Sequence, residues 1–261
     1  MSSGADGWET PRALAPFQRG ERAMALFQSS VVRNRLLSAL SQDDFALLEP
    51  MLERVPLPLR HILIEANQPI QHVYFPESGI ISTLADTEEG KIETGLIGRE
   101  GMVGVPVILG VDQTPHSFMV QGVGEALRIS TPDLRAAISE RPSIFALLGR
   151  FIHTLIVQMG QTAYVNVVFN IEARLARWIL MTQDRTGSDE LLLTHEFLAA
   201  MLGAHRPAVT SATHALEGMG SIRNRRGRIE VLRRDNLLEL AGDSYQVTED
   251  EYERVMSLPR G

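Results

Sequence analysis

Arginine is concentrated near the end of this chain, in a segment whose charge is opposite to that of the whole. The segment from His205 to Arg234 contains seven arginines and two acids, a net charge of +5, whereas the chain as a whole has a net charge of −7. Guanidinium groups bind phosphate oxygens and the major-groove edge of guanine, so a basic segment in an acidic chain indicates a specific DNA-binding module joined to a separate body. A solvated charged face is the alternative interpretation.

Two short helices joined by a glycine turn are predicted at the start of this segment. Thr194 has the side chain of an N-cap for a first helix that ends at Gly203, and a second helix runs from about His205 to Gly218. Ala199 has a small side chain that lets the two helices cross closely. This is the helix-turn-helix pattern.

The second helix has an apolar face and a polar face when its residues are placed at intervals of 100°. Val209 and Ala212 lie on the apolar face, and Arg206 stands in the first turn of the polar face. The first turn of a recognition helix meets base edges, where arginine is the usual partner of guanine. We expect DNA contacts from Thr194, His205, Arg206, Pro207, Thr210, Ser211 and His214.

A hairpin with arginines at its tip is predicted directly after the recognition helix. In the segment SIRNRRGRIEVL, strands over 221–223 and 228–232 flank an Asn-Arg-Arg-Gly turn. Such a hairpin is a wing, and arginines there are suited to phosphate contacts. The expected phosphate ligands are Arg223, Arg225, Arg226 and Arg228.

Residues 143–166 are predicted to form one long helix with an apolar repeat at alternating spacings of four and three residues. This spacing is typical of a two-stranded helical seam, so we expect the helix to join two copies of the chain. A core helix of a monomer is the alternative. The expected interface residues are Leu148, Ile152, Leu155, Ile156, Met159 and Ala163.

Short β-branched and aromatic runs alternate with turn residues between Leu57 and Ser130, which predicts a β-sandwich or jelly roll. The runs are HILIE, HVYF, GIISTL, KIETGLI, HSFMVQ and EALRIS. Two short amphipathic helices are expected before them, between Arg33 and Arg54, with Ser41 as the cap of the second. A further helix is expected after them, from Thr131 to about Arg141.

The predicted elements define an α+β protein. We expect a flexible arm over 1–30, a β-roll sensor domain over 31–142, a dimerisation helix over 143–169 and a winged helix-turn-helix domain over 170–261. Asn170 is the expected cap of a helix over 171–183, and the hinge between sensor and DNA-binding domain is expected near it.

The composition excludes several other classes of protein. The chain has no cysteine, which removes disulfides, iron–sulfur clusters and thiolate zinc sites. The N-terminal segment has no signal-peptide pattern and no membrane span is expected, so a cytoplasmic location is the default expectation. Nucleophile-elbow, HExxH and Walker motifs do not occur, and no pair of histidines has i, i+4 spacing, so we expect neither an enzyme nor a metal or other cofactor.

The order of β-roll, long helix and winged helix, together with the motifs GAHRPAVTSATHALEGMGSI and RRGRIEVL, resembles the cAMP receptor protein and FNR (Crp/Fnr) family of bacterial regulators over about residues 31–245. The resemblance implies a homodimer that binds double-stranded DNA and acts through RNA polymerase. It also implies that Arg206 is the first guanine-reading arginine. Pro207 stands where the better-known members have a glutamate, and Ser211 stands where they have a second arginine, so their operator sequence is not expected here.

The sensor half departs further from that family. The family's nucleotide pocket has a glycine-glutamate turn followed by Arg-Ser/Thr-Ala, with the arginine on the cyclic phosphate. Here the turn reads GREGMVG and the later triplet is His116-Ser117-Phe118. The corresponding effector pocket is expected at Arg99, Glu100, His116 and Ser117.

We therefore expect a homodimeric, sequence-specific transcriptional regulator whose effector is unknown and is not cyclic AMP. Two alternatives stay open at this point. One is a cyclic-nucleotide-responsive regulator with a divergent pocket, and the other is a β-roll interaction module that does not bind DNA.

Overall fold

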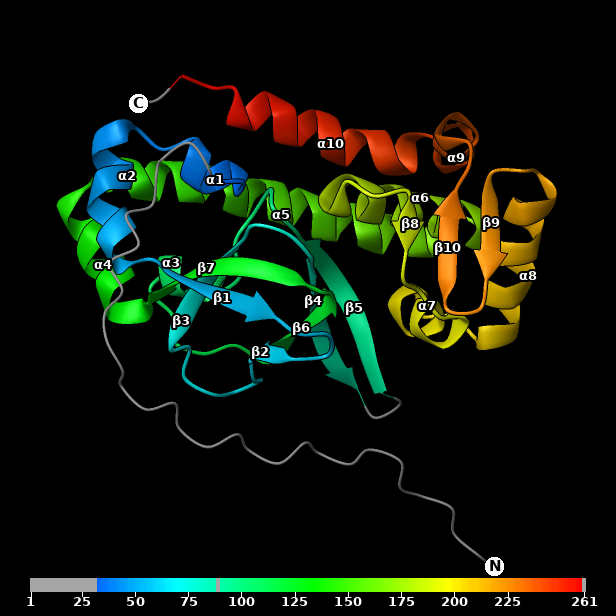
Figure 1. Ribbon diagram of the computed structural model, residues 1–261, viewed down its shortest axis with the longest axis horizontal. Helices are drawn as coiled ribbons and strands as arrows, with labels where there is room; N and C mark the ends of the chain where they lie inside the picture. The colour runs from blue at the N-terminus through cyan, green and yellow to red at the C-terminus, as the bar shows by residue number, and fades with distance from the viewer. Residues whose placement is uncertain (1–31, 88–89, 260–261) are drawn as a thin grey trace, which may run out of the picture. The chain divides into compact units, whose positions relative to one another are not determined.

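The computed structural model describes residues 32–87 and 90–259 (Figure 1). The arm expected over 1–30 lies outside these residues. Along the described chain, a domain of two antiparallel sheets is followed by one long helix and then by a helical domain that contains a small third sheet. This is the predicted α+β architecture.

Two short helices begin the described chain, as predicted: α1 (Arg35–Ser38) and α2 (Gln42–Leu48), with the 3-10 helix η2 (Glu49–Met51) directly after them. Ser41 caps α2, because its hydroxyl oxygen accepts a hydrogen bond from the backbone N–H of Asp44 at 3.1 Å. The predicted cap is therefore confirmed.

The six predicted strands are all present, and the structure adds a seventh. The strands form two antiparallel sheets, with orders β1-β7-β3 and β2-β6-β4-β5. Buried side chains from both sheets, such as Phe75 and Leu127 on one and Ile81 on the other, form the core of the roll. The strands are β1 (Glu53–Leu57), β2 (Ile62–Ile64), β3 (His72–Pro76), β4 (Ile80–Thr87), β5 (Gly90–Ile97), β6 (His116–Gly122) and β7 (Gly124–Ser130).

Strand β1 was not predicted, because its sequence ERVPL contains Pro56 and overlaps the region expected to be helical. The strand pairs with β7 along one side only, so it lies at the edge of its sheet. A proline lacks the backbone N–H that a central strand needs, and an edge strand tolerates that loss. The local sequence therefore concealed a strand that tertiary pairing stabilises.

Helices close the sensor domain and lead into the rest of the chain: α3 (Val105–Ile108), α4 (Thr131–Glu140) and α5 (Pro142–Val168). Ser130 caps α4, since its hydroxyl oxygen accepts a hydrogen bond from the N–H of Asp133. Helix α5 is the predicted long helix, and it ends just before Asn170, which caps α6 (Ile171–Thr186) through its side-chain oxygen and the N–H of Ala173 at 2.9 Å. The predicted cap at Asn170 is confirmed.

The C-terminal part contains the predicted helix-turn-helix and wing, followed by two helices for which the sequence made no prediction. The last helix lies beside α5 in Figure 1, where it runs along the long helix. The elements are β8 (Glu190–Leu191), α7 (His195–Leu202), α8 (Arg206–Gly218), β9 (Ile222–Arg225), β10 (Arg228–Val231), α9 (Arg234–Ala241) and α10 (Asp243–Met256).

Helix α5 bears on the expectation that the chain has no membrane span. Its length and composition are those of a helix able to cross a bilayer, with a mean hydropathy of 1.4 over its most apolar stretch. Core helices of soluble proteins have the same length and composition. In this protein, 39% of that stretch is buried. One side of α5 packs on α10, where Nε2 of His153 and the carboxylate of Glu251 form a hydrogen bond of 2.7 Å.

A buried carboxylate joins the sheet of β2, β6, β4 and β5 to α6. Glu93 of β5 is 8% exposed, and its carboxylate accepts hydrogen bonds from the indole N–H of Trp178 at 3.0 Å and from the hydroxyl of Ser82. The Trp178 ring then packs edge-on against Phe197 of α7, with ring centroids 5.8 Å apart. Burial raises the pKa of Glu93 to about 7, against the two hydrogen bonds and the charges of Arg177 and Arg185, which lower it.

Glu93 is expected to make stability depend on pH. Because its pKa is raised in the folded protein, its contribution to stability is fully present below about pH 4.5 and is lost as pH rises through about 7. The Glu93→Gln variant cannot titrate at this position. Its unfolding free energy should exceed that of the wild type by on the order of 1–3 kcal/mol at pH 8, and the difference should shrink toward pH 5.

Urea unfolding of the wild type and Glu93→Gln at pH 5, 6, 7 and 8 measures this difference. The contributions of the other titrating groups are common to both proteins and cancel when the two free energies are subtracted. Glu93→Ala is the control, since it leaves the indole N–H of Trp178 without an acceptor and should destabilise at every pH. Parallel pH curves for the wild type and Glu93→Gln would show that Glu93 does not titrate in this range.

Candidate nucleic-acid interface

Helices α7 and α8 meet in the geometry that the sequence predicts. Thr194 caps α7, its hydroxyl oxygen accepting a hydrogen bond from the N–H of Phe197 at 3.1 Å. Gly203 ends the helix with φ of 54°, a left-handed conformation that glycine adopts without strain. The predicted helix-turn-helix is confirmed as a structural motif.

Helix α8 turns its apolar side inward and its polar side outward. Val209, Ala212 and Leu216 are fully buried, while Arg206 in the first turn is exposed. Ala208, in the first turn of α8, is also exposed. Of the other residues predicted to contact DNA, Thr194, His205, Pro207, Ser211 and His214 are also exposed.

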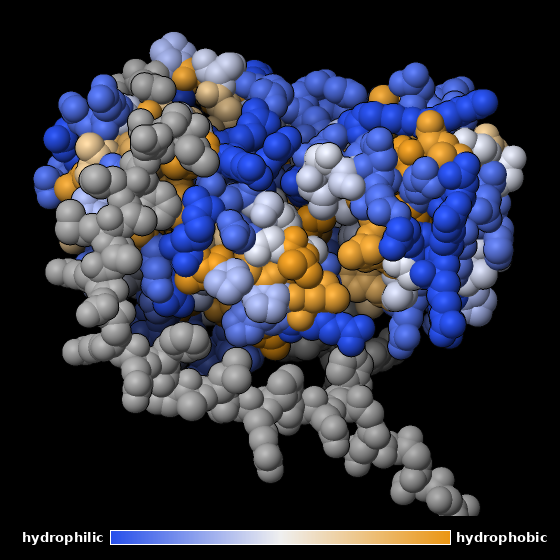
Figure 2. All heavy atoms as spheres, in the orientation of Figure 1, coloured by the Kyte–Doolittle hydropathy of each residue, from blue (hydrophilic) through white to orange (hydrophobic). Residues whose placement is uncertain are grey.

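The wing is a two-stranded hairpin whose arginines fall into two pairs. Arg223 is bound to Glu230 at 2.8 Å and Arg228 is bound to Glu190, so both carry an acidic partner already. Arg225 and Arg226 are exposed at the tip, where Gly227 takes φ of 72°. In Figure 2 the surface over β9 and β10 is strongly hydrophilic.

Thr210, half-buried on α8, belongs to a hydrogen-bonded group with His195 and Asn224, two residues that were not predicted to form part of the site. Its hydroxyl donates to the carbonyl of Arg206 at 3.0 Å and lies 3.0 Å from Nδ1 of His195, the first residue of α7. Nε2 of His195 lies 3.2 Å from the side-chain nitrogen of Asn224 on β9. The contact forms where α7, α8 and β9 meet in the folded protein, so the spacing of these residues along the sequence did not predict it.

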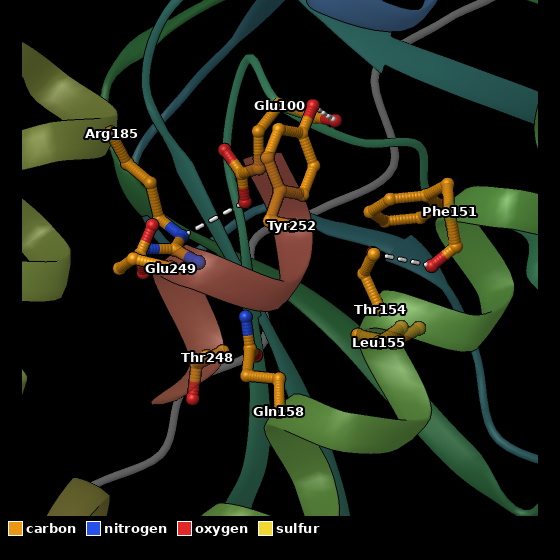
Figure 3. A pocket seen from close by; sticks show the side chains of 9 residues that line it. All are labelled: Glu100, Phe151, Thr154, Leu155, Gln158, Arg185, Thr248, Glu249 and Tyr252. Carbon is orange, nitrogen blue, oxygen red and sulfur yellow. Dashed lines mark hydrogen bonds and ion pairs between the residues drawn. The ribbon is translucent and has the colours of Figure 1, made fainter. Parts of the chain in front are cut away.

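The residues expected to form an effector pocket have separate surroundings. Arg99 is exposed, whereas Glu100 accepts a hydrogen bond from Nε of Arg185 at 2.8 Å, and its carbonyl accepts one from the hydroxyl of Tyr252 at 2.8 Å (Figure 3). The cavity beside Glu100 has a volume of about 20 Å³, room for roughly one water molecule. Side chains from α5, α6 and α10 line this cavity.

On the other side of the predicted pocket, His116 is half-buried and Ser117 is buried on β6. Phe118 follows them, 5% exposed, in register with Ile64 of β2 and Thr83 of β4. The phenyl ring is thus part of the packed sheet. The triplet His116-Ser117-Phe118 contains no arginine that could bind a phosphate.

Helix α5 places its predicted interface residues on more than one side. Leu148 and Ile152 are buried within the protomer, and Leu155 lines the cavity beside Glu100. Ile156 is 63% exposed, Ala163 is exposed and Met159 is half-buried. Phe145 and Val167 extend the apolar stripe on the exposed side of the helix.

Two family models match the chain over the regions just described. A cyclic nucleotide-binding domain matches residues 54–141 and a Crp-like helix-turn-helix domain matches residues 173–240. Both domains and their order agree with the fold of the sensor roll and the winged helix. The C-terminal helix α10 lies beyond the second match.

Solved structures with the same fold are similar at low sequence identity. A protein assigned to the Crp/Fnr family from Eubacterium rectale has a TM-score of 0.63 and 18% identity, over 79% of this chain and 97% of that one. FixK2 from Bradyrhizobium japonicum has a TM-score of 0.64 and 12% identity, over 73% and 98%. The c-di-GMP responsive global regulator CLP from Xanthomonas campestris has a TM-score of 0.61 and 16% identity, over 73% and 99%. No curated protein sequence matches the chain closely enough to be counted as a relative.

A sensor-type β-roll joined by one long helix to a winged helix-turn-helix defines a DNA-binding regulator, not an enzyme. The chain belongs to the Crp/Fnr family of transcriptional regulators, as the two domain matches in this order establish and as its residue motifs predicted.

Arg206 and the wing arginines are expected to have different effects on DNA binding. Arg206→Ala should cost roughly 1–3 kcal/mol and relax base preference at one position in each half-site. Arg226→Ala should weaken binding to all sequences and lower the slope of log K against log salt by about one. Arg228→Ala should have a smaller effect, because Arg228 is shared with Glu190.

Fluorescence-anisotropy titrations at several salt concentrations, on specific and scrambled duplexes, separate these effects. Arg141→Ala, an exposed arginine of the sensor domain, is the matched control and should leave both quantities unchanged. A wing variant that altered base preference while keeping the salt slope would contradict this division of roles.

Proposed function

We propose that the protein is a homodimeric regulator that reads a two-fold symmetric operator with one α8 helix in each of two successive major grooves. The observation that carries this proposal is the exposed first turn of α8, with Arg206 on the same domain as the exposed arginines of the wing tip. Base readout by the helix and phosphate contact by the wing then act together on one half-site.

The proposed DNA contacts follow from the surface that α8 and the wing present. Arg206 reads guanine in the major groove, with Ser211 and His214 further along the same exposed face. Thr194 lies at the N-terminus of α7, where its exposed position suits a phosphate contact. His205, Pro207 and Thr210 complete the contact surface, and the wing supplies Arg223, Arg225, Arg226 and Arg228.

Dimerisation is proposed along the exposed side of α5. Phe145, Ile156 and Val167 are 45%, 63% and 86% exposed, and at 100° per residue they fall within about 40° of one another on one side of the helix. A Cβ added at Gly149 or Gly160 would meet nothing within 4 Å, so a partner helix has room to approach closely. An apolar stripe with small residues is what a two-stranded seam requires.

We keep the domain bounds expected from the sequence in this proposal: a sensor over 31–142, a dimerisation helix over 143–169 and a DNA-binding domain over 170–261. The proposed setting is the cytoplasm, with RNA polymerase as the partner that converts DNA binding into promoter output.

The proposed effector is not cyclic AMP. A buried cyclic phosphate needs a positive partner, and the position of the family's arginine is held by His116. Phe118 fills the neighbouring space, and Glu100 is already engaged by Arg185. A cyclic-nucleotide-responsive regulator with a divergent pocket is the alternative, with Arg99 as the substitute for the missing arginine.

Selection of binding sites from random duplex DNA with purified protein tests the proposed function. The expected product is a symmetric site whose half-sites are centred about 10 base pairs apart, or a multiple of that spacing. A pool with no enriched sequence, or an enriched site without symmetry, would contradict it.

Ile156→Glu is expected to give monomers. Two carboxylates facing each other in an apolar seam would cost on the order of several kcal/mol. Sedimentation velocity should show loss of the dimer together with loss of operator binding. Ala146→Glu is the control, because this exposed position lies about 100° around the helix from Phe145 and outside the stripe. A dimer that survives Ile156→Glu would place the interface elsewhere.

Calorimetry with cyclic AMP and cyclic GMP should show no binding at physiological concentrations, since no arginine stands at the expected phosphate position. The Arg99→Ala variant tests the one substitute nearby. Micromolar affinity in the wild type that disappears in Arg99→Ala would establish the divergent-pocket alternative in place of our proposal.

A further inference from the structure

Three elements that present DNA-contacting residues meet at one side chain, His195. This residue begins α7 directly after the cap Thr194 and is half-buried. It lies 3.0 Å from the hydroxyl of Thr210 on α8 and 3.2 Å from the side-chain nitrogen of Asn224 on β9.

The hydrogen bonds around His195 form a chain with one consistent direction. The amide nitrogen of Asn224 can only donate, so Nε2 of His195 accepts and the ring proton lies on Nδ1. Nδ1–H then donates to the hydroxyl oxygen of Thr210, and that hydroxyl donates to the carbonyl of Arg206 at 3.0 Å. The Nδ1–H tautomer gives each of these three contacts one donor and one acceptor.

A second contact holds the same strand to α8. Oε1 of Glu217, near the end of α8, accepts a hydrogen bond from the backbone N–H of Asn224 at 2.8 Å. The wing is therefore attached to the far end of the recognition helix by Glu217 and to its first turns by His195. These two contacts lie toward opposite ends of α8 and restrain the tilt of the wing, in addition to the apolar packing of Ile222 and Ile229.

We propose that His195 is a positioning residue that sets the angle between the recognition helix and the wing. Arg206 and the arginines of the wing tip can then engage one half-site together. The proposal rests on the DNA contacts given under the proposed function, and it adds to them a residue that need not touch the DNA.

The tautomer is the first measurement. Nitrogen-15 shifts of the His195 ring in the free wild-type protein should show the Nδ1–H form, although a free histidine side chain favours Nε2–H. Asn224→Ala removes the donor to Nε2 and should release this preference. An Nε2–H ring in the wild type would overturn the proposal regardless of any DNA measurement.

The second measurement is rescue on DNA. His195→Gln places an amide oxygen near the position of Nε2 and should retain the wing contact, while His195→Asn reaches only as far as Thr210 and should lose it. We expect His195→Asn to weaken operator binding about ten-fold, the equivalent of one to two hydrogen bonds, and His195→Gln to recover most of that loss. Thermal unfolding of both variants controls for folding, and equal losses in the two variants would contradict the proposal.

Coupling to the wing is the third measurement. Arg226→Ala should lower the salt slope by about one in the wild-type background and by less than half of that in His195→Asn. The same change in both backgrounds would show that the wing does not depend on His195. A direct phosphate contact by His195 predicts instead that Asn224→Ala leaves DNA binding unchanged. If Arg206→Ala kept its base preference, the assignment of DNA contacts would fail while the tautomer result stood on its own.

Discussion

The hydrogen bond between the indole of Trp178 and the buried carboxylate of Glu93 joins the two halves of this protein. Trp178 belongs to α6, and the apolar core around it continues from Leu84 and Leu96 of the sensor sheet into the helix-turn-helix. Helix α6 in turn supports α8, so the direction in which the recognition helix points follows from how α6 lies on the sheet. A buried carboxylate that must be satisfied by specific donors makes this contact directional in a way that apolar packing alone does not.

Helix α5 packs within the chain on one side and exposes apolar residues on another. Toward the protomer it contacts β5, where Gln158 accepts a hydrogen bond from the N–H of Leu96 at 3.0 Å, and α10, whose Glu251 binds His153. Away from the protomer it carries an apolar stripe with open space at its glycines. The same helix can therefore hold its own domains together and, on the proposal made here, a second copy of the chain. Helix α10 also brings Tyr252 against the turn at Glu100, where the cavity has a volume of about 20 Å³.

The sequence predicted the elements whose signals are local. Capping residues such as Ser41 and Asn170, the left-handed glycine Gly203 and the period of α8 depend only on neighbours along the chain, and all of them agree with the structure. Strand β1 and helix α10 were missed, because an edge position tolerates Pro56 and because α10 is held by ion pairs and hydrogen bonds to distant residues. Glu93, Arg185 and His195 gave no signal for the same reason: each acquires its role from a partner that is far away in the sequence. The polar face of the recognition helix was found, but the split of the wing arginines into paired and unpaired sets required the positions of Glu190 and Glu230.

In the proposed function, α8 reads guanine through Arg206 in the major groove of two half-sites, a contact that methylation interference on DNA can detect. Arginine binds guanine through N7 and O6, so methylation of N7 at the contacted base blocks the contact. On a selected operator we expect strong interference at one guanine in each half-site, related by the two-fold axis, and loss of that interference with Arg206→Ala. Interference confined to adenine N3 in the minor groove, or a pattern that Arg206→Ala leaves unchanged, would show that Arg206 does not read guanine in the major groove.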